Sequence, residues 1–284
     1  MKKVKRPQKT IHLKVIVIVV LMAVFVKVLD HYGSTDSPPE YPDYEMVDLN
    51  ETINFNDVYQ GIMDRETEGL LFLQTGLGME GIKTLIEESD DLKEFQKVLT
   101  VYQKQLFSGE GRKSVVKLEN GDVLVSMSQR LCYYPHGHAA IVIDGEKKRI
   151  LEARSYVAGS CVCKQEKWEK LSSFVVLRIK EEVVEKFELK ENKNPAECAA
   201  VYAAENLDGL KYSLLKDLRP LPDTPPEYTQ CAHLVWYAYY VSGLDIDENR
   251  GLIIKPKDFL ESDVLEVVQV FGINPRDLME LRGE

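Results

Sequence analysis

The sequence predicts an α+β domain, and two features of the residue pattern carry this prediction. Between residues 115 and 179 the chain is a series of short strand-like segments separated by turns such as Glu119-Asn120-Gly121-Asp122. Segments with the apolar spacing of helices follow, first at 195–207 and then from Cys231 onward. A block of antiparallel strands followed by helices is typical of an antiparallel sheet packed against helices. We therefore place the main domain at residues 115–284.

A helical region at residues 56–108 precedes this domain. Apolar residues recur there at helical spacing, and Gly76 and Gly78 separate two of the expected helices. The region has no group of residues that suggests chemistry. We interpret it as a spacer or brace packed on the main domain, with a substrate-selecting cap as the alternative. Residues 30–55, which include a Pro-containing polar stretch, are expected to form a linker.

The N-terminus has the pattern of a membrane anchor. Residues 1–10 are polar and basic, and an unbroken apolar run at 15–26 follows within a longer apolar segment, 11–29. A bilayer needs about 20 residues of helix, which this segment supplies if its two lysines extend toward the interfaces. Basic residues before the run and acidic residues after it place the N-terminus in the cytosol and the body outside. A cleaved signal peptide and a buried core helix are the alternatives, but no small-residue cleavage site follows the run.

The charge balance excludes a nucleic-acid-binding protein. The chain has 36 basic and 46 acidic residues, a net charge of −10. Seven basic residues precede Asp30, so the rest of the chain has 29 basic residues against 46 acidic ones. A nucleic-acid binder needs a basic footprint, which this acidic body lacks.

Cys231 stands where a polar, Pro-rich approach gives way to an apolar helical run that Gly243 closes. A thiol in the first turn of a helix faces unpaired backbone N–H groups and the positive end of the helix dipole. Both favour the thiolate, which is the nucleophilic form of cysteine. Cys231 is therefore the candidate nucleophile.

A cysteine nucleophile requires a base, and the base requires a group that orients it. The chain has five histidines, of which His12 and His31 flank the apolar N-terminal segment. His136, His138 and His233 remain. Only His138 begins a strand-like segment directly after a glycine, where the backbone can approach closely.

The strand that His138 begins turns back into a second strand that contains Glu152. We expect the two strands to pair so that residue 143 faces residue 149. One face of the hairpin then carries four residues: His138, Ala140, Glu152 and Arg154. Glu152 becomes the diagonal neighbour of His138 and can fix the orientation of its ring. A slip by one residue would place Glu152 on the other face.

Several short motifs occur in a characteristic order over residues 115–265. They are Gly121-Asp122-Val123-Leu124-Val125, Gly137-His138-Ala139-Ala140-Ile141-Val142, Ile150-Leu151-Glu152-Ala153, Val176-Leu177-Arg178, Tyr212 and Cys231-Ala232-His233-Leu234-Val235-Trp236. This order resembles the circularly permuted branch of the NlpC-type papain-like cysteine hydrolases. The resemblance implies a papain-like α+β fold in which the histidine strand precedes the cysteine helix. It also implies Cys231 as nucleophile, His138 as base and Glu152 as the third polar group.

Three further residues are candidates for binding substrate or the oxyanion. Tyr212 matches a family tyrosine that lies close to the cysteine, with simple core packing as the alternative. His136 is a second polar partner or a solvated loop residue. His233 departs from the family pattern, where a small residue is commoner; it forms a hydrogen bond within the helix or lines the cleft. The Cys-x-His order is similar to the lecithin retinol acyltransferase-like branch, which leaves a lipid substrate open.

The other four cysteines allow up to two disulfides outside the cell. Cys161 and Cys163 point to the same side of a strand and are poor partners for each other, whereas Cys132 with either is plausible. A zinc site from Cys132, His136, Cys161 and Cys163 is conceivable, but its spacing matches no closed zinc motif. Cys198 is expected in the core. With no nucleotide loop, metalloprotease motif or cofactor fingerprint, we expect neither metal nor cofactor.

These observations predict a single-pass bacterial membrane protein with an extracellular cysteine hydrolase domain. The resemblance points to amide bonds in peptidoglycan stem peptides or related amides. One alternative is a lipid acyl or fatty-amide hydrolase or acyltransferase. A second is a binding module that kept the fold without the chemistry. The expected partners are the substrate and the membrane, not nucleic acid, and no oligomeric state is indicated.

Overall fold

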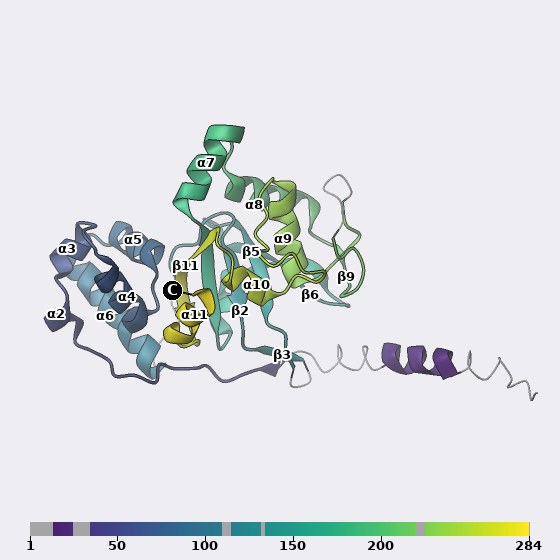
Figure 1. Ribbon diagram of the computed structural model, residues 1–284, viewed down its shortest axis with the longest axis horizontal. Helices are drawn as coiled ribbons and strands as arrows, with labels where there is room; N and C mark the ends of the chain where they lie inside the picture. Colours follow the sequence, from purple (N-terminus) through teal and green to yellow (C-terminus); the bar gives the residue numbers. More distant parts are fainter. Residues whose placement is uncertain (1–13, 25–34, 110–114, 132–133, 220–224, 284) are drawn as a thin grey trace, which may run out of the picture.

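The computed structural model describes residues 14–24, 35–109, 115–131, 134–219 and 225–283, and at its centre is a six-stranded antiparallel sheet. In spatial order the strands are β11 (Leu265–Phe271), β8 (Phe174–Ile179), β2 (Val123–Ser126), β5 (His138–Asp144), β6 (Arg149–Ser155) and β7 (Gly159–Lys164). Together with the helices around it, this sheet confirms the α+β class (Figure 1).

Both faces of the sheet are covered, which makes it the middle of three layers. Along β2, Val123 and Val125 belong to one hydrophobic core and Leu124 to the other, because successive side chains of a strand point to opposite faces. The first core contains residues from four helices: α8 (Pro195–Asn206), α9 (Cys231–Val241), α10 (Pro256–Leu260) and α11 (Pro275–Arg282). The second core contains residues of the N-terminal helical region.

The helical region consists of short helices that pack on the second face of the sheet (Figure 1). They are α2 (Leu49–Thr52), α3 (Phe55–Tyr59), α4 (Arg65–Thr75), α5 (Met79–Glu88) and α6 (Leu92–Ser108). Asp64 and Asp91 cap the N-termini of α4 and α6, and Gly76 and Gly109 end these helices in the left-handed conformation. Caps of this kind explain why the apolar pattern is divided into separate helices.

The loop between α4 and α5 joins the helical region to the sheet. The Gly78 N–H donates to the carbonyl of Val268 at 3.1 Å, and the Val270 N–H donates to the carbonyl of Gly76 at 2.7 Å. A Cβ on Gly78 would lie 1.7 Å from the Val267 carbonyl oxygen, so only glycine fits this approach. The two glycines that separate the helices in the sequence therefore also dock them on β11.

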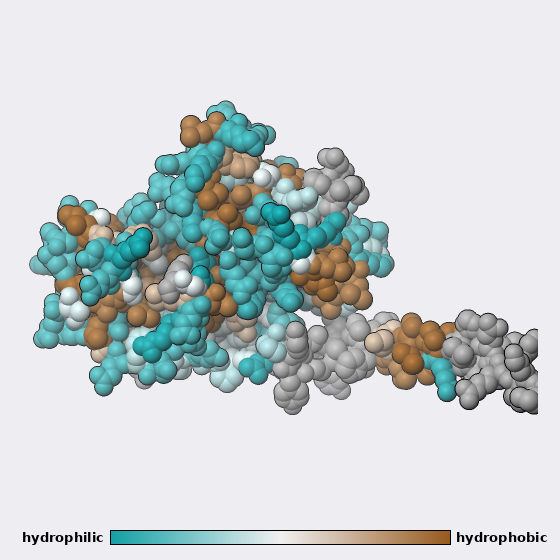
Figure 2. Space-filling view, viewed as in Figure 1, coloured by the Kyte–Doolittle hydropathy of each residue, from teal (hydrophilic) through white to brown (hydrophobic). Residues whose placement is uncertain are grey.

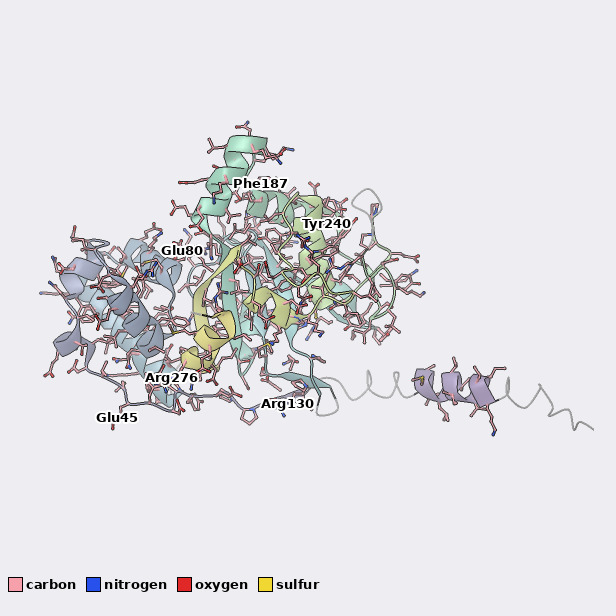
Figure 3. The ribbon with its side chains drawn as sticks, viewed as in Figure 1. Glu45, Glu80, Arg130, Phe187, Tyr240 and Arg276 are labelled. Carbon is pink, nitrogen blue, oxygen red and sulfur yellow. The ribbon has the colours of Figure 1, made fainter. Side chains whose placement is uncertain are left out.

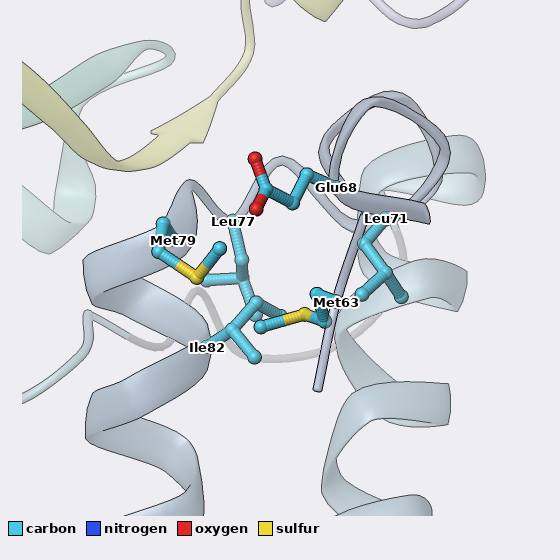
Figure 4. A pocket seen from close by; sticks show the side chains of 6 residues that line it. All are labelled: Met63, Glu68, Leu71, Leu77, Met79 and Ile82. Carbon is cyan, nitrogen blue, oxygen red and sulfur yellow. The ribbon is translucent and has the colours of Figure 1, made fainter. Parts of the chain in front are cut away.

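A small hollow lies within the helical region, between α4 and α5. It is lined by Met63, Glu68, Leu71, Leu77, Met79 and Ile82 (Figure 4). All of these residues belong to the segment 63–82, so the hollow is separate from the candidate catalytic residues.

Two of the motif residues stabilise the sheet. Arg178 of β8 donates from Nε to Asp122 Oδ1 at 2.8 Å and from Nη2 to Asp122 Oδ2 at 2.9 Å, and it also contacts Glu119. Asp122 is buried in the turn before β2, and the Tyr239 hydroxyl of α9 donates to the carbonyl of Gly121 in that turn. A buried bidentate pair of this kind fixes the turn to both β8 and α9.

Several expectations about the peripheral segments are wrong. The linker is partly folded: it contains β1 (Thr35–Asp36), which pairs with β3 (Gln129–Leu131), and α2, where Leu49 is buried. Residues 115–118 are not a strand, although Val116 and Leu118 are buried. β3 also pairs with the short β4 (Tyr134–Pro135).

Helix α7 (Glu181–Glu191), which we did not expect from the sequence, has no fully buried residue and packs through half-buried Val183, Val184 and Phe187. Its Phe187 lies over Gly243, just past the end of α9; a Cβ on that glycine would come within 3.2 Å of the Phe187 ring (Figure 3). This contact fixes the outer helix to the end of the helix that carries Cys231.

Residues 14–24 of the expected anchor are helical and their apolar side chains are exposed. Residues 11–13 and 25–29 of the same segment lie outside the described residues. Within the described part of the chain, no helix combines the length and the hydropathy that crossing a bilayer requires.

Candidate active site

Cys231 is the first residue of α9, as the sequence predicts. The residue before it, Gln230, is the N-cap: its Oε1 accepts a hydrogen bond from the Ala232 N–H at 2.9 Å and one from the Cys231 thiol at 3.4 Å. Its Nε2 donates to the carbonyl of Ile254 at 2.8 Å. One buried amide side chain therefore fixes the start of the helix, the position of the sulfur and the neighbouring loop.

The hairpin that carries the other two candidates has the expected register at the site. Ala140 faces Glu152, which makes Glu152 the diagonal neighbour of His138. The expected pairing at the turn end is wrong, because Asp144, and not the residue before it, faces Arg149. A bulge just before Asp144 takes up the extra residue, so the error at the turn does not reach the site.

His138 and Glu152 are in direct contact. The His138 Nε2 lies 2.8 Å from Glu152 Oε2, and the Glu152 side chain is almost completely buried. Its other oxygen, Oε1, accepts from Lys167 Nζ at 2.8 Å and forms an ion pair with Arg154, whose Nε lies 3.0 Å away. Burial opposes ionisation, but the contacts with His138 and Lys167 outweigh it and lower the pKa of Glu152 to about 2. Glu152 is therefore a carboxylate held by three cationic side chains.

The imidazole of His138 is held in its protonated form. Burial lowers the pKa of this ring, but hydrogen bonds with Cys231 and with Glu152 outweigh burial and raise the pKa to about 9. Since Nε2 contacts Glu152, Nδ1 is the ring nitrogen that remains for the sulfur. Trp168 stacks on the ring, with centroids 5.3 Å apart and planes inclined by 13°. Cys231, His138 and Glu152, predicted from the sequence as a unit, thus lie together.

Lys167 and Trp168 are the residues of the site that sequence reasoning missed. Both belong to a short 3-10 helix, Gln165–Lys170, that follows β7. No spacing relates them to Glu152, because the contact depends on how this helix folds over the end of the sheet. Arg154 was expected on the same face as Glu152. In the structure it also forms an ion pair with the Glu152 carboxylate.

Tyr212 lies beside the approach to the nucleophile. It belongs to β9 (Lys211–Tyr212), which pairs in parallel with β10 (Tyr228–Thr229). Tyr212 faces Thr229, two residues before Cys231, and its ring contacts that of Tyr156 with centroids 5.2 Å apart. It is half-buried, at the edge of the site.

The other two histidines have no direct contact with Glu152 among the interactions of the described residues. His136 contacts the carbonyl of Gly137 through Nδ1, and burial lowers its pKa. His233 is buried inside α9, with Nδ1 at 2.9 Å from the Thr229 hydroxyl and its ring stacked on Tyr237. Burial lowers the pKa of His233 to about 4, so the ring is neutral.

The remaining described cysteines, Cys161, Cys163 and Cys198, are free thiols. Cys161 faces Glu152 across β6 and β7, and burial together with Glu152 raises the pKa of Cys163 to about 12. Cys132 lies outside the described residues. The expected disulfide with Cys161 or Cys163 and the conceivable zinc site both include Cys132, so they too lie outside the described residues. Among the residues that are described, no group of three or more metal-ligating side chains is found.

Comparison of the chain with family models, curated proteins and solved structures finds no match to any of the three.

The geometry is suited to nucleophilic chemistry. Cys231, at a helix start, helps to raise the pKa of the His138 imidazole, and a buried carboxylate 2.8 Å from Nε2 orients that ring. An imidazolium beside a thiol favours the thiolate. The first residue of a helix also has no intrahelical acceptor for its N–H, so the Cys231 N–H can donate to another acceptor.

Proposed function

We propose that this protein is a cysteine hydrolase that cleaves amide bonds with Cys231 as nucleophile, His138 as acid and base, and Glu152 as the residue that orients the histidine. The observation that carries the proposal is the 2.8 Å contact of the His138 imidazole with the buried Glu152 carboxylate, on a strand that shares its hydrophobic core with the helix that begins at Cys231. We further propose a papain-like arrangement, because the histidine strand precedes the cysteine helix and the third polar group follows on the next strand.

In this mechanism the proton of the Cys231 thiol is already on the His138 ring, so the reaction starts from a thiolate beside an imidazolium. The thiolate attacks the carbonyl carbon, and the N–H of Cys231 donates to the oxyanion that forms. As the C–N bond breaks, the imidazolium returns its proton to the leaving amine, which leaves a thioester on Cys231. Water then loses a proton to His138, attacks the thioester and releases the carboxylic acid and the thiol.

Glu152 has a positioning role in this sequence of steps. Its Oε2 accepts from Nε2, so that Nδ1 points to the sulfur, and its negative charge stabilises the imidazolium. Lys167 and Arg154 hold its other oxygen and prevent the carboxylate from rotating away.

For the substrate, we propose amide bonds of peptidoglycan stem peptides or related amides, hydrolysed outside a bacterial cell by a protein anchored through residues 11–29. The apolar run with basic residues before it supports this topology. The test is to incubate the full chain with soluble peptidoglycan fragments, quench with acid and search for an acyl group on Cys231 by mass spectrometry. We expect a thioester on Cys231 and a new free amine in the product, with or without a chelator. Hydrolysis that needs zinc and leaves Cys231 unmodified would refute the proposal.

A second candidate is a lipid acyl or fatty-amide hydrolase or acyltransferase that uses the same three residues. Exposed leucines beside the site, Leu214 and Leu215, favour it because an aliphatic chain binds to aliphatic side chains. Fatty amides added to the same experiment would leave a fatty-acyl thioester on Cys231 if this candidate is correct.

A further inference from the structure

Aliphatic side chains are exposed on three loops around Cys231. Val157 is 92% exposed in the turn after β6, Leu215 is 76% exposed after β9, and Leu252 is 70% exposed before α10. We call this surface the apolar rim, and it consists of Tyr156, Val157, Leu214, Leu215, Leu252 and Ile253. Hydrophobic side chains gather where β6 and β9 lie (Figure 2).

Side-chain contacts join the three loops to one another and to Gln230, the residue before Cys231. The Tyr156 and Tyr212 rings join the first loop to the second, and Arg219 Nε donates to the Gly251 carbonyl at 2.7 Å, which joins the second to the third. The third loop reaches the site through Ile254, whose carbonyl accepts from the N-cap Gln230. These contacts place the rim residues on connected loops, one of which is bonded to the residue before Cys231, instead of scattering them over the surface.

Basic side chains accompany the rim. Residues 211–219 and 250–257 contain six basic residues and one acidic residue, in a chain whose net charge is −10. Three of the six pair with acidic residues outside these segments, namely Glu227, Asp247 and Glu261. An excess of positive charge remains when these partners are counted. The three basic residues that are not paired in this way, Lys216, Arg250 and Lys255, are exposed.

We propose that the apolar rim docks on the surface of a lipid bilayer that contains anionic headgroups, so that Cys231 opens toward the membrane. Protruding aliphatic side chains with lysines beside them match the boundary between acyl chains and anionic headgroups. The rest of the acidic body is repelled by such a surface, so the charge distribution selects this one face.

The chain length supports the same orientation, although this part rests on the anchor of the proposed function. Five residues, 30–34, lie between the proposed anchor, 11–29, and Thr35. A chain of this length reaches at most about 18 Å. An anchored body would therefore stay close enough to the bilayer for the rim to meet it.

Tryptophan fluorescence of the full chain in lipid vesicles tests the docking without using catalysis. The chain has two tryptophans, Trp168 and Trp236, and both are buried, 2% and 1% exposed. A third tryptophan is introduced by Leu215→Trp or, in a separate variant, Leu252→Trp. The matched control is Leu189→Trp on α7, where the leucine is 89% exposed and remote from the rim. Vesicles contain phosphatidylglycerol and phosphatidylcholine, with or without bromine on the acyl chains, and flotation confirms that each variant is bound.

Brominated lipid should remove most of the emission added by either rim tryptophan and little of that added by the control. Lys216→Glu together with Lys255→Glu should reverse the quenching, whereas Lys190→Glu on α7 should not. Vesicles of phosphatidylcholine alone should give weaker quenching at the rim. A chain that floats while its rim tryptophans are quenched no more than the control would overturn the docking and leave the proposed hydrolase untouched. A chain that does not float would overturn the anchor and the docking together, and thioester formation on Cys231 would still be measurable.

Discussion

His138 is half-buried and His233 is buried, and the protein shifts the pKa values of these two histidines in opposite directions. The pKa of His138 is raised to about 9, and that of His233 is lowered to about 4. Burial lowers the pKa of both rings, so the difference comes from their partners. His138 has the Glu152 carboxylate and the Cys231 sulfur, whereas His233 has the uncharged Thr229 hydroxyl.

The comparison shows that closeness in the sequence is a poor guide to a catalytic base. His233 is two residues from Cys231, but residues two apart on a helix point to different sides of it. His138 is far away in the sequence and reaches the sulfur because β5 and α9 pack together in one core. Burial alone would disfavour the positive charge of the His138 imidazolium. The negative charge of Glu152 offsets this cost.

The largest effect should come from removing the groups that react. We expect Cys231→Ser and His138→Ala each to lower kcat by at least about a thousand-fold, because the nucleophile and its base act as a unit. For the same reason the double variant should be little worse than either single variant. Steady-state kinetics of amine release measure the effect. Activity that survives in Cys231→Ser would disprove the assignment, whereas His233→Phe is the control and should keep most of the wild-type rate.

The second expected effect concerns the reactivity of the thiols. At neutral pH iodoacetamide should modify Cys231 faster than Cys163, since burial and Glu152 raise the pKa of Cys163 to about 12. His138→Ala should slow the modification of Cys231, because the imidazolium that stabilises its thiolate is gone, and should leave Cys198 unaffected. Peptide mass spectrometry over a time course gives the rates. If the Cys231 rate is the same with and without His138, the two residues are not coupled.

Glu152→Gln should have a smaller effect on rate and a diagnostic effect on pH dependence. A glutamine still accepts from Nε2 but has no charge, so we expect kcat to fall by about ten- to a hundred-fold. Without the carboxylate, the pKa of His138 should drop from about 9 toward its ordinary value of 6.5. The alkaline limb of the pH–rate profile should therefore move to lower pH. Glu166→Gln, an exposed change in the same part of the chain, is the control, and an unmoved alkaline limb would contradict the charge role of Glu152.

The same two groups give stability a defined pH window. The raised pKa of His138 means that its contribution to stability is complete below about pH 6.5 and is lost as the pH rises through about 9. The lowered pKa of Glu152 means that its contribution is present above about pH 4.5 and is lost as the pH falls through about 2. Between these limits the two charged side chains stabilise each other.

Local patterns predicted the centre of the site. The α+β class followed from the alternation of strand-like and helical segments, and the start of α9 followed from the change from polar to apolar residues at Cys231. The sequence also predicted that His138 and Glu152 share a face. The register at Ala140 is unaffected by the wrong pairing at the turn, so the two-residue alternation of the strand still holds there. The bulge before Asp144 is that error, and it lies outside the stretch where Ala140 faces Glu152.

What the sequence did not predict depends on contacts between distant segments. Lys167 and Trp168 reach the site through the packing of a short 3-10 helix, for which no residue spacing gives a signal. The segment around Val116 and Leu118 has the residue types of a strand. The Val116 N–H, however, donates to the Gln269 side chain and not to a neighbouring strand. Helix α7 carries only a short apolar stripe of Val183, Val184 and Phe187, which is half-buried and whose two valines pack against the core.

The smallest effect on catalysis, and the sharpest control for the comparison, is expected for His233→Phe. Phenylalanine preserves the stacking on Tyr237 and removes the hydrogen bond with Thr229, whose hydroxyl still donates to the Gln230 carbonyl at 3.1 Å. We expect the free energy of unfolding to fall by about 1 kcal/mol at pH 7.

Because the native pKa of His233 is about 4 and the ordinary value is 6.5, the unfolded chain binds a proton in this range that the native chain does not. Wild-type stability should therefore fall as the pH drops from 6.5 to 4, and the variant should lose that part of the slope. Denaturant unfolding of the full chain in detergent at several pH values measures both terms. A variant with the wild-type slope would show that His233 is not the neutral histidine of this pair.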